Sequence, residues 1–195
     1  MSTESRRMTR PSQLERTELN EEQARIYDAI LKSRGSIAGP FGIWLHSPVL
    51  ADCAQLLGEF VRYRTSLEPR LSELAILVTA RFWDCQVEWS LHEPFAVESG
   101  LSEGVIDAVR QGRDPNFGRD DERAVFDYVS ELLNNRFVPD GVFNAAQKAV
   151  GKKGVVELTG IAGYYSLVAQ TLNAFQVPVP EGCAPTLVDC PTFEA

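Results

Sequence analysis

The sequence lacks several features that would place it in a common class of protein at once. It has only two histidines and four cysteines, and the cysteines form neither a CxxC pair nor a spacing typical of a metal site. No apolar run approaches the length needed to span a membrane, and residues 1–12 contain no apolar stretch of the kind that a secretory signal requires. We therefore expect no metal, no membrane partner, and the reducing environment of a cytoplasmic location.

The sequence also lacks an excess of basic residues. Its 19 Lys and Arg against 27 Asp and Glu give a formal net charge of −8. Binding to nucleic acid or to an anionic membrane needs clustered positive charge that displaces counterions, so neither is an expected partner. A small-molecule substrate or another protein fits this composition better.

No alternating apolar and polar run with flanking turn signals occurs, so the sequence predicts no sheet. Apolar residues instead recur at helical spacing from residue 20 onward. We predict an all-α, single-domain bundle of about seven or eight helices. The expected helices are about 20–34, 47–64, 69–83, 84–100, 102–110, 120–135, 140–151 and 154–175.

The predicted domain covers residues 19–180, between a disordered or extended tail at 1–18 and a C-terminal tail at 181–195. The helix after Pro69 is apolar on nearly all sides, which is typical of a central helix. Gly160 and Gly163 lie three apart in the last helix. Helical glycines are costly unless another helix or a bound molecule approaches closely, so we expect such an approach here.

Asp84 is the expected N-cap of a helix, and three reactive side chains share one face of that helix. Cys85, Glu88 and His92 are separated by three and four residues, the offsets of helix neighbours. A cysteine in the first turn experiences the positive helix end, which favours thiolate. A carboxylate and a histidinium favour each other's charged forms, so this group can exchange protons near neutral pH.

A second carboxylate, Glu73, comes from the preceding helix and leaves an apolar face, where burial would raise its pKa and make it a proton donor. Structural roles compete with all four assignments. A lone cysteine is more often a small core residue, and an i,i+4 Glu–His pair is often a surface contact. Glu73 can also pair with Arg70 or Arg81 and fix the packing of two helices.

These residues carry a resemblance to a known family. The run Leu71 to Ala75, then Cys85, then Glu88-Trp89-Ser90-Leu91-His92 and Gly100-Leu101-Ser102 resembles the carboxymuconolactone decarboxylase family. Its alkylhydroperoxidase D-like branch has a Glu, two cysteines three apart, and a His four residues further on. Here Glu88 stands in place of the second cysteine, which removes the dithiol cycle and is similar to the decarboxylase branch.

The resemblance covers roughly residues 40–180 and implies an alkylhydroperoxidase D-like helical fold that assembles into rings, commonly trimers or hexamers. It also implies active sites near subunit contacts and neither a metal nor an organic cofactor. The catalytic residues that it implies are Glu73, Cys85, Glu88 and His92. The apolar central helix independently favours a homo-oligomer, because it offers more apolar surface than a small bundle readily hides.

Three functions remain open. The leading hypothesis is a cofactor-independent acid/base enzyme of the decarboxylase-like type that acts on a small carbonyl or carboxylate compound. The alternatives are a single-cysteine peroxidase, in which a peroxide oxidises Cys85, and a non-catalytic oligomeric binding protein. Candidate substrate-binding residues are three arginines that can hold a carboxylate and two aromatic residues: Arg62, Arg64, Arg81, Trp89 and Tyr164.

Overall fold

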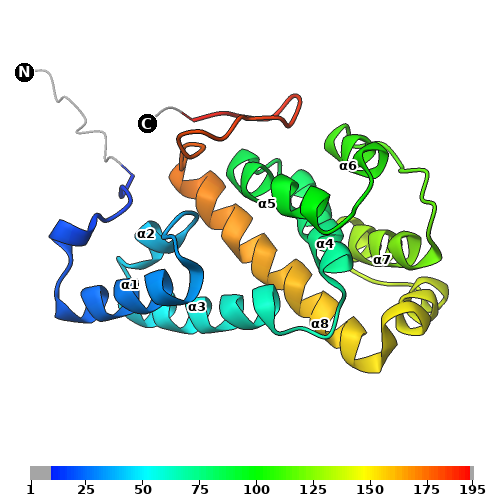
Figure 1. The fold of residues 1–195 in the computed structure, drawn as a ribbon, viewed down its shortest axis with the longest axis horizontal. Helices are drawn as coiled ribbons and strands as arrows, with labels where there is room; N and C mark the ends of the chain where they lie inside the picture. The colour runs from blue at the N-terminus through cyan, green and yellow to red at the C-terminus, as the bar shows by residue number, and fades with distance from the viewer. Residues whose placement is uncertain (1–9, 194–195) are drawn as a thin grey trace, which may run out of the picture.

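The computed structural model describes residues 10–193, and every regular element within this range is helical (Figure 1). This confirms the predicted all-α fold. The first nine residues of the predicted N-terminal tail lie outside the described residues, as do residues 194–195. The elements are η1 (Arg16–Glu18), α1 (Glu21–Arg34), α2 (Phe41–Trp44), α3 (Pro48–Tyr63), α4 (Pro69–Phe82), α5 (Gln86–Glu98), α6 (Glu103–Arg110), α7 (Asp120–Asn135) and α8 (Asp140–Phe175).

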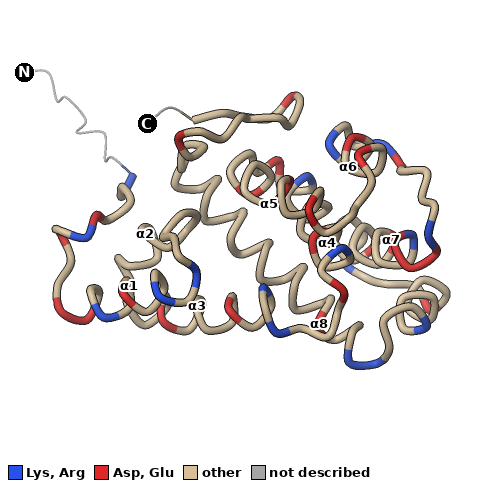
Figure 2. The backbone as a smooth tube through the Cα atoms, viewed as in Figure 1, with Lys and Arg blue, Asp and Glu red and all other residues tan. Residues whose placement is uncertain are grey.

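Helix α4 forms the centre of the bundle, as its apolar sequence predicts. Every residue from Arg70 to Ala80 is buried, and the helix packs against α5, α7 and α8. The part of α8 that follows Glu157 contains no charged residue, which Figure 2 shows as a long tan stretch of the tube. These two helices therefore form the core on which the remaining helices pack.

Helix α8 contains a break that the sequence anticipates. Gly151 has φ 76° and ψ 171°, which is not helical, so the element consists of two helices joined at the glycine predicted to end the first one. No other helix of the described residues makes the close approach expected at Gly160 and Gly163. Nothing outside the local helix lies within 4 Å of a Cβ built at either position.

The close contact occurs at Gly58 on α3 instead. A Cβ at this buried position would overlap the hydroxyl of Tyr164 on α8 and the guanidinium of Arg34 at the end of α1. The missing side chain therefore makes room for two side chains from different helices. Residues 36–46, which lie between the first two expected helices, are beside this contact and contain the short, fully buried helix α2.

A tight turn joins α4 to α5 and determines where α5 begins. Asp84 has φ 50°, a left-handed conformation that Asp tolerates better than most residues. Cys85 follows as the N-cap with φ −92° and ψ 96°. The prediction that Asp84 caps α5 is therefore wrong, and its side chain pairs with Arg81. The helix also continues past Pro94 and ends at Glu98.

Helix α3 has one buried face and one exposed apolar face. Its small residues, including Ala51, Ala54 and Gly58, face the bundle. The outer face carries apolar side chains that are 38–70% exposed: Val49, Leu50, Leu56, Leu57, Phe60 and Tyr63. Together with the exposed Cys53, positions 49, 53, 56, 60 and 63 alternate offsets of four and three, which is the pattern of a helix that packs against another helix.

The described segments before α1 and after α8 are also attached to the bundle. Leu14 donates its backbone N–H to the carbonyl of Gly42 at 3.1 Å. Near the other end, the Gln86 side chain and the backbone of the buried Leu187 form two hydrogen bonds of 2.7 and 3.2 Å. Figure 1 shows this C-terminal segment passing over α5. Between residues 10 and 193, no helix is long and apolar enough to cross a bilayer.

The contact at Gly58 gives a first testable prediction. Gly58→Ala should lower the free energy of unfolding by about 1–3 kcal/mol, because the added methyl overpacks the α3–α8 contact. The matched control is Gly163→Ala, an exposed helical position with open space, where alanine should stabilise by up to about 1 kcal/mol. Chemical denaturation of both variants measures the difference, and a loss of stability in the control alone would contradict this packing.

Candidate active site

Two glutamates and a histidine meet where α4 and α5 pack together. The α5 residues Glu88 and His92 lie one helical turn apart, and His92 Nε2 is 3.1 Å from Glu88 Oε1. On its other side, His92 Nδ1 is 2.9 Å from Oε2 of Glu73 on α4. All three side chains are buried. The expected convergence of these three residues is therefore present, and the surface-pair alternative for Glu88 and His92 is wrong.

Arg62 from α3 completes this cluster. Its guanidinium forms an ion pair with Glu73 and lies 4.4 Å from the ring centroid of Phe95. Its Nη1 is also 3.3 Å from His92 Nδ1. Both nitrogens carry hydrogens directed to the same carboxylate, so they share Glu73 as acceptor rather than bonding to each other. Arg62 was expected to hold a substrate carboxylate, but its charge is already taken up by Glu73.

The geometry determines the protonation state of His92. A neutral imidazole has one N–H, so one of the two flanking carboxylates would then face a lone pair. Burial lowers the pKa of His92, but the hydrogen bonds and negative charges of Glu73 and Glu88 outweigh it and raise the pKa above its usual range. The imidazolium form gives each carboxylate a donor, and the cluster of Arg62, His92, Glu73 and Glu88 then has no net charge.

Glu73 behaves differently from the sequence-based expectation. Burial raises its pKa, as expected, but the hydrogen bond from His92 and the charges of His92 and Arg62 lower the pKa by more. The carboxyl is therefore ionised, and the prediction that burial makes it a proton donor is wrong. Neither Arg70 nor Arg81 pairs with it, since Arg70 binds Asp121 and Glu122.

Cys85 departs furthest from expectation. Its side chain is fully buried, and burial, together with the negative charge of Glu88, raises the pKa of the thiol to about 12. Hydrogen bonds from the backbone N–H groups at the start of α5 oppose this rise but do not cancel it. The expected preference for thiolate is therefore wrong, and a buried thiol of this kind is a poor nucleophile.

A cavity of about 80 Å³ lies beside the cluster. Of the four residues expected to be catalytic, Glu88 and His92 line it, whereas Glu73 and Cys85 do not. The Tyr165 ring packs edge-on against the His92 ring at 5.0 Å between centroids. The remaining lining residues come from α1, the following loop, α2, α3, α5 and α8: Arg34, Ala38, Gly39, Pro40, Phe41, Arg62, Leu91, Tyr164 and Val168.

The structure separates the other candidate substrate-binding residues. Tyr164 lines the cavity, but Arg64 forms an exposed ion pair with Glu59, and the Trp89 ring is buried with its Nε1 donating to Glu93 at 2.8 Å. Arg34 and Tyr165 line the cavity and were not among the candidates. Neither belongs to the spacing pattern around Cys85, so only a pattern that links distant helices could have found them.

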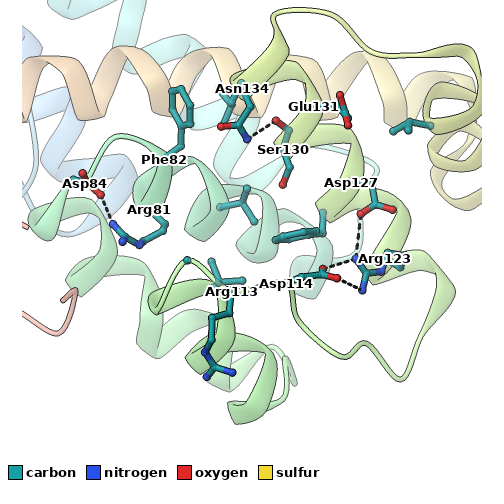
Figure 3. A pocket seen from close by; sticks show the side chains of 16 residues that line it. Arg81, Phe82, Asp84, Arg113, Asp114, Arg123, Asp127, Ser130, Glu131 and Asn134 are labelled. Carbon is teal, nitrogen blue, oxygen red and sulfur yellow. Dashed lines mark hydrogen bonds and ion pairs between the residues drawn. The ribbon is translucent and has the colours of Figure 1, made fainter. Parts of the chain in front are cut away.

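Arg81 lines a different and larger cavity of about 790 Å³, bounded by α4, α7 and the segment before α7 (Figure 3). Its charged groups are largely paired with one another. Arg123 binds Asp114 at 2.6 Å and Asp127 at 3.3 Å, and Arg81 binds Asp84. None of the four expected catalytic residues lines it. Size alone does not indicate the chemistry, so we assign the candidate active site to the smaller cavity.

The two carboxylates beside His92 lead to a prediction about its protonation at neutral pH. Because its pKa is raised on folding, its contribution to stability is complete below the ordinary pKa of about 6.5 and is lost as the pH rises through the higher folded pKa. We expect NMR to show both ring nitrogens protonated at pH 7 and a titration midpoint above 6.5. Glu73→Gln should lower that midpoint, because it removes a negative charge beside the ring. A neutral His92 ring at pH 7 would contradict this arrangement.

Comparison with known proteins supports the fold. No family model matches the chain, and no curated protein matches it. Among solved structures, the chain is similar to ATU0492 from Agrobacterium tumefaciens, a protein of unknown function described as a candidate antioxidant defence protein AhpD. The TM-score is 0.64 at 20% identity, over 73% of this chain and 98% of that chain.

The chain is also similar to the debrominase Bmp8. A cysteine-to-alanine variant in complex with 2,3,4-tribromopyrrole matches with a TM-score of 0.70 at 11% identity, over 87% of this chain and 91% of that chain. The apo form matches with a TM-score of 0.69 at 12% identity, over the same shares. At these identities the likeness establishes the fold, and the chain accordingly has the all-helical architecture of AhpD-like proteins.

Proposed function

We propose that the protein is an acid/base enzyme of the decarboxylase-like type that acts on a small carbonyl or carboxylate compound and needs no cofactor. The observation that supports it is the position of His92, whose two ring nitrogens face Glu73 and Glu88 at 2.9 and 3.1 Å. An imidazolium held in this way can give up a proton and recover it without moving. Only Glu88 and His92 of this group reach the cavity, so they are the proposed proton carriers.

In the proposed reaction, the bond between the substrate carbon and its carboxylate breaks and leaves carbon dioxide and an enolate. Arg62 and His92 both line the cavity, and their N–H donors stabilise the negative charge that develops on the enolate oxygen. The Glu88–His92 pair then donates a proton to the carbon, and water returns a proton to the pair. Glu73 acts as a positioning residue, because it holds the ring in its charged form from the side away from the cavity.

The thiol peroxidase alternative has less support. A peroxidatic cysteine must be accessible and ionised, whereas Cys85 is fully buried and its thiol pKa is raised to about 12. The similar structures carry descriptions as different as antioxidant defence and debromination, so the fold does not select one chemistry. The four cysteines are free thiols, which suits the reducing compartment proposed for this protein.

The comparison of His92→Ala with Cys85→Ser tests this proposal. On the same proton-transfer substrate, His92→Ala should lower the rate by about 10²–10⁴-fold, because it removes the proton carrier. Cys85→Ser should have a much smaller effect, since the thiol does not line the cavity. Circular dichroism and thermal denaturation confirm that both variants fold. Activity that is lost in Cys85→Ser and survives in His92→Ala would overturn the proposal, and a peroxide-dependent activity with that pattern would favour the peroxidase.

We further propose that the protein is a homo-oligomer that buries the exposed apolar face of α3 against a second copy. Six apolar side chains lie on this face, and positions 49, 53, 56, 60 and 63 alternate offsets of four and three, as in paired helices. Monomeric proteins rarely expose an apolar patch of several hundred Å² without a partner. The family resemblance independently suggests a trimer or hexamer.

Light scattering tests this assembly. The protein at micromolar concentration should have a mass that is a multiple of 21.6 kDa. The double variant Leu56→Glu/Leu57→Glu should shift it toward the monomer, because it places charge in the apolar face. The control is Phe137→Glu, which changes an exposed apolar residue outside α3. A wild-type mass of 21.6 kDa under these conditions would contradict the assembly.

A further inference from the structure

Arg34, the last residue of α1, is a charged residue at the cavity whose role is not explained by the cluster around His92. It lines the cavity together with Glu88 and His92. Its Nη2 donates to the backbone carbonyl of Gln55 at 3.3 Å, which is a long contact. Its Nε is buried and has no hydrogen-bond partner within residues 10–193. A buried donor without a partner is unfavourable, so the arginine has capacity for a further acceptor.

The surrounding residues hold this guanidinium in place without neutralising it. It stacks over the Phe41 ring with 4.8 Å between Cζ and the ring centroid, and lies 5.9 Å from that of Tyr63. Gly58 leaves the space on α3 into which Arg34 and the Tyr164 hydroxyl extend. Aromatic faces stabilise a cation and position it, but they leave its charge uncompensated.

The charges at the cavity do not balance without a ligand. The pairs formed by Arg62 and His92 with Glu73 and Glu88 have equal positive and negative charge. Arg34 adds one positive charge, and it takes part in none of the ion pairs found among the described residues. A single negative charge in the cavity would therefore complete the site electrostatically.

We propose that Arg34 binds the carboxylate of a small, singly charged, partly apolar substrate and positions its carbon skeleton against Glu88 and His92. This inference rests on the proposed function and specifies its substrate class. The cavity of about 80 Å³ accommodates only a small molecule. Its apolar walls, which include Val168 and the ring of Phe41, suit the hydrocarbon part of such an acid. The carboxylate accepts hydrogen bonds from the guanidinium of Arg34 where it lines the cavity.

The test uses crotonate, a small unsaturated carboxylate, and its neutral isostere crotonamide. Isothermal titration calorimetry on the full chain gives the two affinities, and the NMR signals of His92 report whether the ligand reaches the cavity. We expect crotonate to shift these signals saturably and to bind at least about tenfold more tightly than crotonamide, because only crotonate supplies the missing charge.

Variants of Arg34 distinguish anion binding from a structural role. Arg34→Gln should weaken crotonate binding by at least about tenfold and leave crotonamide binding nearly unchanged, whereas Arg34→Lys should restore part of the preference. The matched control is Arg25→Gln, which removes an exposed arginine of the same helix that pairs with Asp52. The His92 signals without ligand should be the same in all of these variants, which shows that the cavity is intact.

Three results would overturn this inference: no crotonate binding, equal affinities for crotonate and crotonamide, or unchanged crotonate affinity in Arg34→Gln. The function of His92 fails separately. If His92→Ala keeps its catalytic rate while crotonate binding still depends on Arg34, the proton-transfer proposal is wrong and the anion site stands. If His92→Ala loses activity while Arg34→Gln binds crotonate normally, the reverse holds.

Discussion

The contact of one imidazole ring with two carboxylates determines most of the local structure. The two ring nitrogens of His92 contact the carboxylates of Glu73 on α4 and Glu88 on its own helix α5. Glu73 also forms an ion pair with Arg62 on α3. Three helices are therefore joined by charged hydrogen bonds inside the protein rather than at its surface. Buried charges are tolerated only when each has a partner, so any change in the packing angle of these helices would leave a charge uncompensated.

Burial gives this cluster its chemical character as well as its rigidity. The ring of Tyr165 on α8 covers His92 from one side, and Phe95 packs against the guanidinium of Arg62. Water is largely excluded, so electrostatic interactions inside the cluster are stronger than they would be in solvent. The same exclusion keeps the thiol of Cys85 neutral, because a buried thiolate has no comparable set of donors. One environment thus favours ionised proton carriers and disfavours an ionised cysteine.

Glu88 stands where the alkylhydroperoxidase D-like pattern that the sequence resembles has a second cysteine, and a carboxylate suits this environment. A thiol at that position would lie against the charged His92 ring, whereas a carboxylate supplies the negative charge that the ring requires. Arg34 extends the same electrostatic argument to the cavity, since no ion pair within residues 10–193 balances its charge. The cluster and the cavity therefore differ in kind: the first is complete without a ligand, and the second is not.

The sequence by itself determined the helices and one face of the site. Helical periodicity fixed the all-α fold and the contact between Glu88 and His92, because residues four apart in a helix are always neighbours. It failed at Cys85, because this residue is the N-cap after the left-handed turn at Asp84, and its thiol is fully buried and does not line the cavity that Glu88 and His92 reach. Only the tertiary structure decided the partners of Glu73 and the presence of Arg34, since these contacts join helices whose relative orientation depends on packing across the whole core and not on any local spacing.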